Sequence, residues 1–220
     1  MPHADTEITQ HAAVSAVDDL GGAFDVHLGA ADERSCVRAG AVILANGSPA
    51  AAAALLGAEA PWSDPGPATT AACLDLALRR HPAQPLVLGL DAPVYLSVHN
   101  PPAKLGPAGT FVVHAMRYGA RSAEQDRPAL DALVARGGIR VGDIIDCRFL
   151  ARMVVSQGTP LAGRGMAGRP GHVIDQHPGL FIAGDWVGPH GLLADAAMAS
   201  GRSAALAGVA VAATTRTAVG

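Results

Sequence analysis

The first sixty residues alternate between apolar and polar positions in short runs. The runs at 12–17 and 23–28 flank a turn rich in Asp and Gly, and period-2 alternation around such a turn predicts a β-hairpin. Residues 41–45 are continuously apolar, as expected for a strand that is buried on both faces. Pro49 then suits the first position of a short, Ala-rich helix. Together these elements predict a small meander that leads back into a parallel sheet.

The middle of the chain has a different pattern. Five further apolar runs, separated by Pro and Gly, predict strands joined by short connections, which favours an antiparallel sheet. These runs lie at 73–78, 85–90, 93–99, 110–118 and 143–157. One helix is predicted over 122–138, because Ser122 is a good N-cap residue and Gly137 follows the last turn. Pro128 disfavours a regular first turn in that helix.

This change of pattern divides the chain into three segments. Residues 1–58 and 166–220 carry the elements of an α/β domain, and residues 59–165 carry the antiparallel sheet. The predicted fold class is therefore α/β, with the α/β domain interrupted by an α+β domain.

Composition and charge argue against several classes of function. Half of the 220 residues are apolar, and the net charge of −3 comes without a basic block, so a nucleic-acid partner is not expected. The three cysteines lack the spacing of a zinc site, so no metal is predicted, and we expect reduced thiols in the cytoplasm. The start of the chain lacks the pattern of a signal peptide, and no apolar run reaches the length of a membrane span.

The most informative stretch is GLFIAGDWVGPHGLLADAAMASGRSAA, at 179–205. Its apolar run at 180–183 predicts a buried strand, and Asp185 follows at the carboxyl end, where ligands bind in open α/β sheets. A carboxylate at this place can accept hydrogen bonds from sugar or polyol hydroxyls. The helix expected to begin near Leu192 or Leu193 offers free backbone N–H groups, which suit an anionic or carbonyl oxygen.

Small residues along the same helix allow a backbone or a flat ligand to come close. They recur at Ala194, Ala197, Gly201, Ala204 and Gly208. The stretch as a whole predicts a ligand with hydroxyls at one end and an electron-poor, hydrogen-bonding ring at the other. Plain packing of a strand, a loop and a helix is the alternative.

This stretch resembles the C-terminal flavin-binding motif of the FAD-dependent amine oxidase and phytoene desaturase superfamily, and it is most similar to the phytoene-dehydrogenase-like branch. The resemblance implies that Asp185 binds the ribityl chain of FAD and that the backbone from Leu192 to Ala194 faces the pyrimidine edge of the isoalloxazine ring. The implied cofactor-binding residues are Gly184, Asp185, Trp186, Gly191, Leu192, Leu193 and Ala194.

The resemblance also implies the domains and the reaction. Residues 1–58 and 166–220 would form a partial, Rossmann-like FAD-binding domain, and residues 59–165 the substrate-binding domain. The implied reaction is removal of a hydride from a C–H bond of a small apolar or amine substrate to flavin N5. Because the flavin supplies the redox chemistry, no catalytic side chain is assigned.

The chain departs from this family in one respect. Its GxGxxG string, at 163–168, is not flanked by a predicted strand and helix, so we expect that the family's pyrophosphate-binding turn is not encoded here. FAD would then bind weakly unless a partner chain or a homo-oligomer completes the FAD domain. The alternatives are a truncated, non-catalytic chain and a small-molecule binding module without redox activity.

Several other side chains are candidates for function. Candidate substrate-binding residues on the predicted strands of the middle segment are Tyr95, His99 and His114. Lys104, the only lysine, either approaches the flavin or is a solvated charge. His190 either approaches the ligand or caps its loop, and Trp186 either packs on the flavin or lies in the core.

Overall fold

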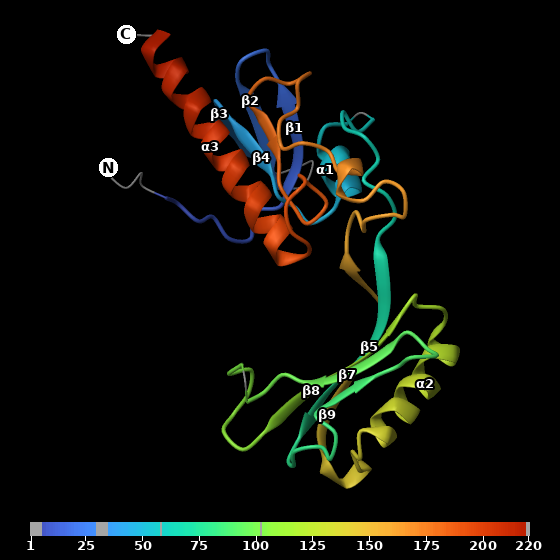
Figure 1. The fold of residues 1–220 in the computed structure, drawn as a ribbon. Coiled ribbons are helices and arrows are strands. Elements are labelled where there is room, and N and C mark those ends of the chain that lie inside the picture. The colour runs from blue at the N-terminus through green and yellow to red at the C-terminus, as the bar shows by residue number, and fades with distance from the viewer. Residues whose placement is uncertain (1–5, 30–34, 58, 102, 219–220) are drawn as a thin grey trace. The chain divides into compact units, whose positions relative to one another are not determined.

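The computed structural model describes residues 6–29, 35–57, 59–101 and 103–218, and its side chains through residue 213. The chain forms two compact units (Figure 1). One consists of residues 1–67 and 157–220 and is called the terminal unit; the other, residues 68–156, is called the middle unit.

The terminal unit begins with the predicted meander. Strands β1 (Val14–Asp19), β2 (Phe24–Leu28) and β3 (Ser35–Ala39) form an antiparallel sheet in the order β1-β2-β3. Val17 and Phe24 point into the core and are almost completely buried. The hairpin predicted from alternation is confirmed, because the inward positions of β1 and β2 are the apolar ones.

The two apolar strands of the terminal unit pair with each other in parallel; the sequence predicted a parallel sheet but not that these two strands are neighbours. β4 (Val42–Leu44) pairs with β10 (Leu180–Ile182) in register. Between them in sequence, helix α1 (Pro49–Leu55) follows β4, and a 3-10 turn (Met166–Gly168) precedes β10. Ser48 caps α1, since its Oγ accepts the backbone N–H of Ala51 at 3.1 Å.

Helix α3 (Ala194–Ala218) packs on this parallel pair through small residues. Its buried row is Ala196, Ser200, Ala204 and Gly208, spaced by four residues. The predicted small-residue face therefore needs correction: Ala194 is exposed, and Ala197 and Gly201 lie at the margin of the contact. A strict four-residue row forms because the helix crosses the short strands along one ridge.

Length and composition alone make α3 a candidate membrane span over Ala194–Ala213, with a mean hydropathy of 1.3 and 17% of that stretch buried. The sequence was expected to hold no apolar run as long as a membrane span. The Ala and Gly residues of α3 make this helix apolar over such a length, because few polar residues interrupt them. One such helix is weak evidence for a membrane, since core helices of soluble proteins, which are mostly buried, reach the same length and hydropathy.

The middle unit contains the predicted antiparallel sheet, and each of the five apolar runs forms one of its strands. The strand order is β6-β7-β8-β5-β9. The strands are β5 (Thr69–Leu78), β6 (Leu86–Leu88), β7 (Val94–Val98), β8 (Phe111–Tyr118) and β9 (Ile144–Ser156). A 3-10 turn (Val141–Asp143) leads into β9.

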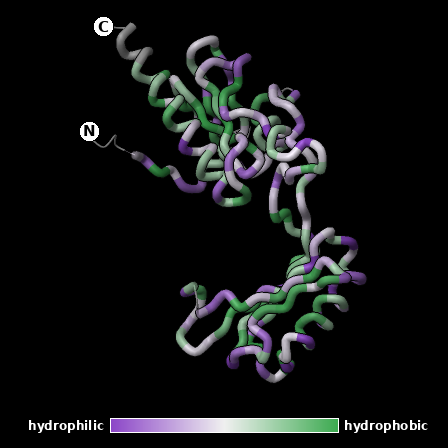
Figure 2. Tube along the Cα trace, in the orientation of Figure 1, coloured by the Kyte–Doolittle hydropathy of each residue, from purple (hydrophilic) through white to green (hydrophobic). Residues whose placement is uncertain are grey.

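Helix α2 (Ala123–Arg136) covers one face of the middle sheet (Figure 1). The core between them is built from alternate strand positions, and Figure 2 shows the apolar stretches of sheet and helix. Its members include Leu74, Leu76, Leu78, Leu96, Val113 and Leu130. The helix forms as predicted and tolerates Pro128, but the Ser122 side chain makes no capping hydrogen bond.

The predicted mixed α/β class is confirmed. The units divide at 67/68 and 156/157, whereas the sequence pattern placed the divisions at 58/59 and 165/166. Both connecting segments contact the terminal unit through tertiary interactions: the ring of Trp62 packs on Trp186, and the carbonyl of Gly158 accepts a hydrogen bond from Arg169. Such contacts between distant residues leave no local pattern in the sequence.

Candidate functional site

The end of strand β10 carries the predicted acid. Asp185 is half-buried, and its Oδ2 accepts a hydrogen bond from the backbone N–H of Gln157 at 2.9 Å. Its other carboxylate oxygen has no partner among the residues that the structure describes. A carboxylate accepts several hydrogen bonds, so this oxygen is available to a ligand hydroxyl.

Gly184 is required by the packing of its neighbour. A Cβ atom at this position would lie 2.6 Å from Nε1 and 2.9 Å from Cδ1 of Trp186. Trp186 itself is only 1% exposed and its ring packs on Trp62, with the ring centroids 5.4 Å apart. Of the two roles expected for the Trp186 ring, its position fits packing in the core.

The loop between Asp185 and α3 is held by an arginine that the sequence did not single out. Arg169 is buried; its Nε donates to the carbonyl of Gly158 at 3.2 Å and its Nη1 to the carbonyl of Gly191 at 3.0 Å. Gly191 has a φ of +72°, and a Cβ there would lie 2.9 Å from the backbone nitrogen of Ala196. Gly191 thus shapes the turn into the helix.

The start of α3 presents the predicted backbone donors. Leu193 adopts a left-handed φ of +52°, and α3 begins at the next residue, Ala194. In the described chain, the backbone N–H groups of Leu192, Leu193 and Ala194 have no acceptor, and both leucine side chains are about half exposed. Free N–H groups at a helix start favour a carbonyl or anionic oxygen.

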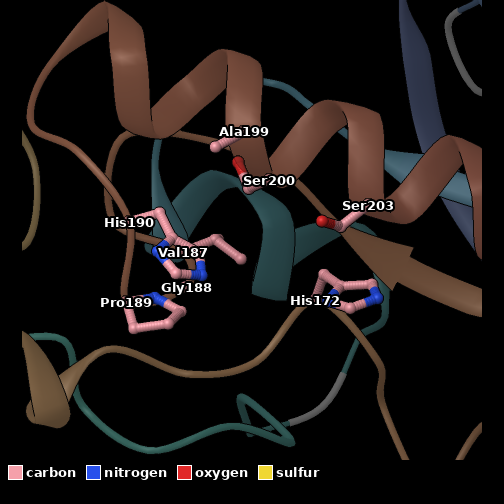
Figure 3. A pocket seen from close by; sticks show the side chains of 8 residues that line it. All are labelled: His172, Val187, Gly188, Pro189, His190, Ala199, Ser200 and Ser203. Carbon is pink, nitrogen blue, oxygen red and sulfur yellow. The ribbon is translucent and has the colours of Figure 1, made fainter.

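Ser200 joins the helix to the strand end. Its Oγ lies 3.1 Å from the backbone nitrogen of Gly184, whose N–H it accepts, and 3.0 Å from the carbonyl oxygen of the same residue. The adjacent pocket is small, about 40 Å³, and Figure 3 shows Ser200 and Ser203 extending from α3 toward the side where His172 and His190 lie. It is too small for a flavin ring, so His190 borders a cavity of the size of one or two water molecules.

The donor set of this region suits FAD. A free carboxylate oxygen on Asp185 matches ribityl hydroxyls, and the free N–H groups before α3 match the carbonyl oxygens of the ring. The exposed side chains of Leu192 and Leu193 add apolar surface beside those donors. The residues present therefore fit the flavin and ribityl part of the cofactor.

The three predicted substrate-binding residues come together on one face of the middle sheet, opposite α2. The hydroxyl of Tyr95 and Nε2 of His99 are 3.2 Å apart, and the rings of His99 and His114 meet edge to face with centroids 4.4 Å apart. Burial is the main cause that lowers the pKa of His99, and the neighbouring His114 lowers it further.

Two residues that the sequence did not single out extend this group. Nδ1 of His114 lies 2.5 Å from Oδ1 of Asp75, and Sγ of Cys73 lies 3.0 Å from the same oxygen. Burial, and then the hydrogen bond to Asp75, raises the pKa of Cys73 to about 12. The alternation of CLDLAL could have indicated both residues. When its leucines face the core, Cys73 and Asp75 lie together on the opposite face of the sheet.

Lys104 lies elsewhere. It is exposed in the loop between β7 and β8, in the middle unit, as expected for a solvated charge.

The chain matches no model of a protein family, and no curated protein matches its sequence. Solved structures do match its fold. The anhydrotetracycline hydroxylase OxyS from Streptomyces rimosus matches with a TM-score of 0.57 at 18% identity, over 96% of this chain and 39% of that one. A geranylgeranyl bacteriochlorophyll reductase-like protein from Thermoplasma acidophilum matches with a TM-score of 0.60 at 17% identity, over 92% of this chain and 49% of that one.

Aklavinone-11 hydroxylase, solved with FAD and aklavinone, matches with a TM-score of 0.53 at 13% identity, over 93% of this chain and 37% of that one. The chain thus spans less than half the length of these structures. Its mixed α/β fold matches part of the fold of FAD-dependent oxidoreductases. The predicted relation is confirmed at that level, and these structures do not single out the amine oxidase or phytoene-dehydrogenase-like branch.

Proposed function

We propose that this chain forms the flavin-ring and substrate-binding parts of an FAD-dependent oxidoreductase. The observation that carries the proposal is the pairing of a free carboxylate oxygen on Asp185, at the carboxyl end of β10, with free N–H groups before α3. The likeness of the fold to FAD-dependent oxidoreductases, one of them solved with FAD, supports it.

Each group would hold a different part of the cofactor. Asp185 would accept hydrogen bonds from the ribityl hydroxyls, and the backbone from Leu192 to Ala194 would donate to the pyrimidine edge of the ring. Positive partial charge at the helix start favours electron density on that edge. When bound, FAD would supply the redox chemistry, either by accepting a hydride from a C–H bond of the substrate or by supporting hydroxylation of the substrate.

The hydride reaction follows from the resemblance of GLFIAGDWVGPHG to phytoene-dehydrogenase-like proteins, and its substrate would be a small apolar or amine compound. Hydroxylation is the second candidate, favoured because two of the matching structures are hydroxylases. In either case Tyr95, His99 and His114 would contact the substrate. Reduction of bound flavin by substrate in the absence of oxygen would support the hydride reaction, whereas a requirement for oxygen and a hydroxylated product would support the second candidate.

We further propose that another protein segment, from a partner chain or a second copy, completes the FAD domain. In the described ranges, β4 pairs on one edge only, with β10. A mainly apolar groove of about 450 Å³ lies beside β4. Its lining includes Val14, Val17, Val26, Val42, Leu44 and Leu55. An added parallel strand would satisfy the free backbone edge and cover this groove.

Cytoplasmic localisation belongs to the same proposal. All three cysteines are free thiols, and Cys36 and Cys147 are exposed, which suits a reducing compartment.

Titration of the purified chain with riboflavin, FAD and ADP tests this function. Riboflavin carries the ring and the ribityl hydroxyls, so we expect it to bind and to lose its fluorescence, while ADP does not compete. FAD that binds at least about tenfold more tightly than riboflavin would indicate a complete dinucleotide site and would argue against the need for another segment. If neither flavin binds at any concentration, the proposed function of these residues is wrong.

A further inference from the structure

We propose that the middle unit holds a divalent transition-metal ion, for which Zn²⁺ is the best match, between the side chains of Cys73, Asp75 and His114. These groups lie on the face of the sheet opposite α2, within one compact unit. The site is independent of flavin binding, because the residues assigned to the flavin belong to the other unit.

The distances suit one small ion. The Cys73 sulfur, a carboxylate oxygen of Asp75 and a ring nitrogen of His114 all lie within 4.8 Å of one another. Tetrahedral zinc has bonds of about 2.0–2.3 Å, which places its ligand atoms roughly 3.3–3.5 Å apart. Oδ1 of Asp75 lies 3.0 Å from the sulfur and 2.5 Å from Nδ1 of His114, so each of these two separations would widen by under about 1 Å to admit the ion.

The kinds of ligand select the ion. Thiolate, imidazole and carboxylate are the three groups that bind zinc in proteins, whereas magnesium and calcium take oxygen ligands. In the ion-free chain, hydrogen bonds occupy the centre, with Asp75 accepting from Cys73 and His114. On binding, Cys73 would lose its proton to solvent, and the proton that His114 donates from Nδ1 would leave that nitrogen, so that Nδ1 binds the metal and Nε2 carries the ring proton.

The sheet places the three ligands in advance. Asp75 and His114 are directly paired on β5 and β8, and Cys73 lies two residues before Asp75, hence on the same face. The leucines between and after them, Leu74 and Leu76, are fixed in the core beneath α2. Ligands on adjacent strands of a packed sheet lose little conformational freedom on binding.

One side of the cluster is open to solvent. Cys73 is buried, but the side chains of Asp75 and His114 are 30% and 29% exposed. A hollow of about 160 Å³ adjoins Asp75. Three protein ligands with an open fourth position are typical of a zinc ion that binds water or a substrate oxygen, not of a closed structural site.

Metal binding to the full chain tests the proposal. The chain is freed of metal with a chelator and titrated with Zn²⁺ against a chromophoric zinc indicator. We expect one zinc per chain, and C73S and H114Q to weaken binding by about tenfold or more. C36S is a matched control, because this exposed thiol lies in the other unit, and it should bind zinc as the parent chain does.

A second measurement does not depend on how the variants fold. X-ray absorption of the zinc-loaded parent chain should show one sulfur and about three nitrogen or oxygen ligands, one of them the solvent at the open position. No zinc bound at one equivalent, a metal shell without sulfur, or binding that is lost in C36S and kept in C73S would each overturn the proposal.

Discussion

Oδ2 of Asp185 accepts a hydrogen bond from the backbone N–H of Gln157 at 2.9 Å. Gln157 is the first residue after β9, where the chain re-enters the terminal unit, and Asp185 lies in the segment that follows β10. The Asp185 carboxylate thus binds the segment that follows β9 through one oxygen, and its second oxygen is available to a ligand. Structural and binding roles of Asp185 can be separated by substitution.

D185A removes both acceptor oxygens. We expect riboflavin affinity to fall about tenfold or more, since a hydrogen bond to a charged group contributes roughly 1.5–3 kcal/mol. D185N keeps an oxygen that can accept from Gln157, so it should retain more thermal stability than D185A while still weakening flavin binding. Fluorescence titration and thermal unfolding measure the two effects, and unchanged flavin affinity in D185A would contradict the assigned role.

The packing at Gly184 can be tested by comparing G184A with the same substitution at a glycine that has open space around it. G184A would force a Cβ to within 2.6 Å of the Trp186 ring, and overpacking of this kind costs about 1–3 kcal/mol of unfolding free energy. Gly201 lies within α3 with nothing within 4 Å of an added Cβ, so G201A should stabilise the chain by about 0.5–1 kcal/mol. Urea unfolding compares them, and equal stability of the two variants would count against the packing described.

Breaking a buried ion pair in the middle unit should cost far more stability than breaking an exposed one. Asp126 is completely buried, bonds to Nη1 of Arg117 at 2.5 Å, and accepts the backbone N–H of Arg121 at 2.7 Å. R117M leaves this carboxylate without its charged partner and is expected to cost about 3–5 kcal/mol. D131N, which breaks the exposed pair with Arg127, should cost below about 1 kcal/mol in the same denaturation experiment. A small effect of R117M would show that the buried Asp126 does not depend on its charged partner.

Asp19 makes the stability of the terminal unit depend on pH in the acid range. The backbone N–H of Gly21, and next the His177 side chain, lower the pKa of Asp19 from its usual value of 3.8. A lowered folded-state pKa contributes stability that is present above the unfolded pKa and is lost as pH falls through the folded value. D19N should therefore lower the urea midpoint at pH 6 and change it less at pH 3. An equal loss at both pH values would exclude this linkage.

Local patterns predicted most of the elements. Alternation located β1 and β2, apolar runs located the five strands of the middle sheet, and the runs at 41–45 and 180–183 located β4 and β10, whereas β3 was not predicted as a separate strand. Features that depend on distant residues could not be predicted. Arg169 binds carbonyl groups 11 and 22 positions away, and Asp75 meets His114 across 39 positions. The buried row of α3 also depends on the angle at which the helix crosses the sheet, which no pattern within the helix specifies.

The most direct test of the central claim is the visible absorption spectrum of the purified chain, recorded with and without added FAD, for the parent chain and D185A. Binding of the ring at the start of α3 predicts a shifted and structured flavin band in the parent chain, which saturates with added FAD and is weakened in D185A. A spectrum identical to that of free FAD at every concentration, or the same shift in both chains, would contradict the proposal that Asp185 and the α3 start hold the flavin.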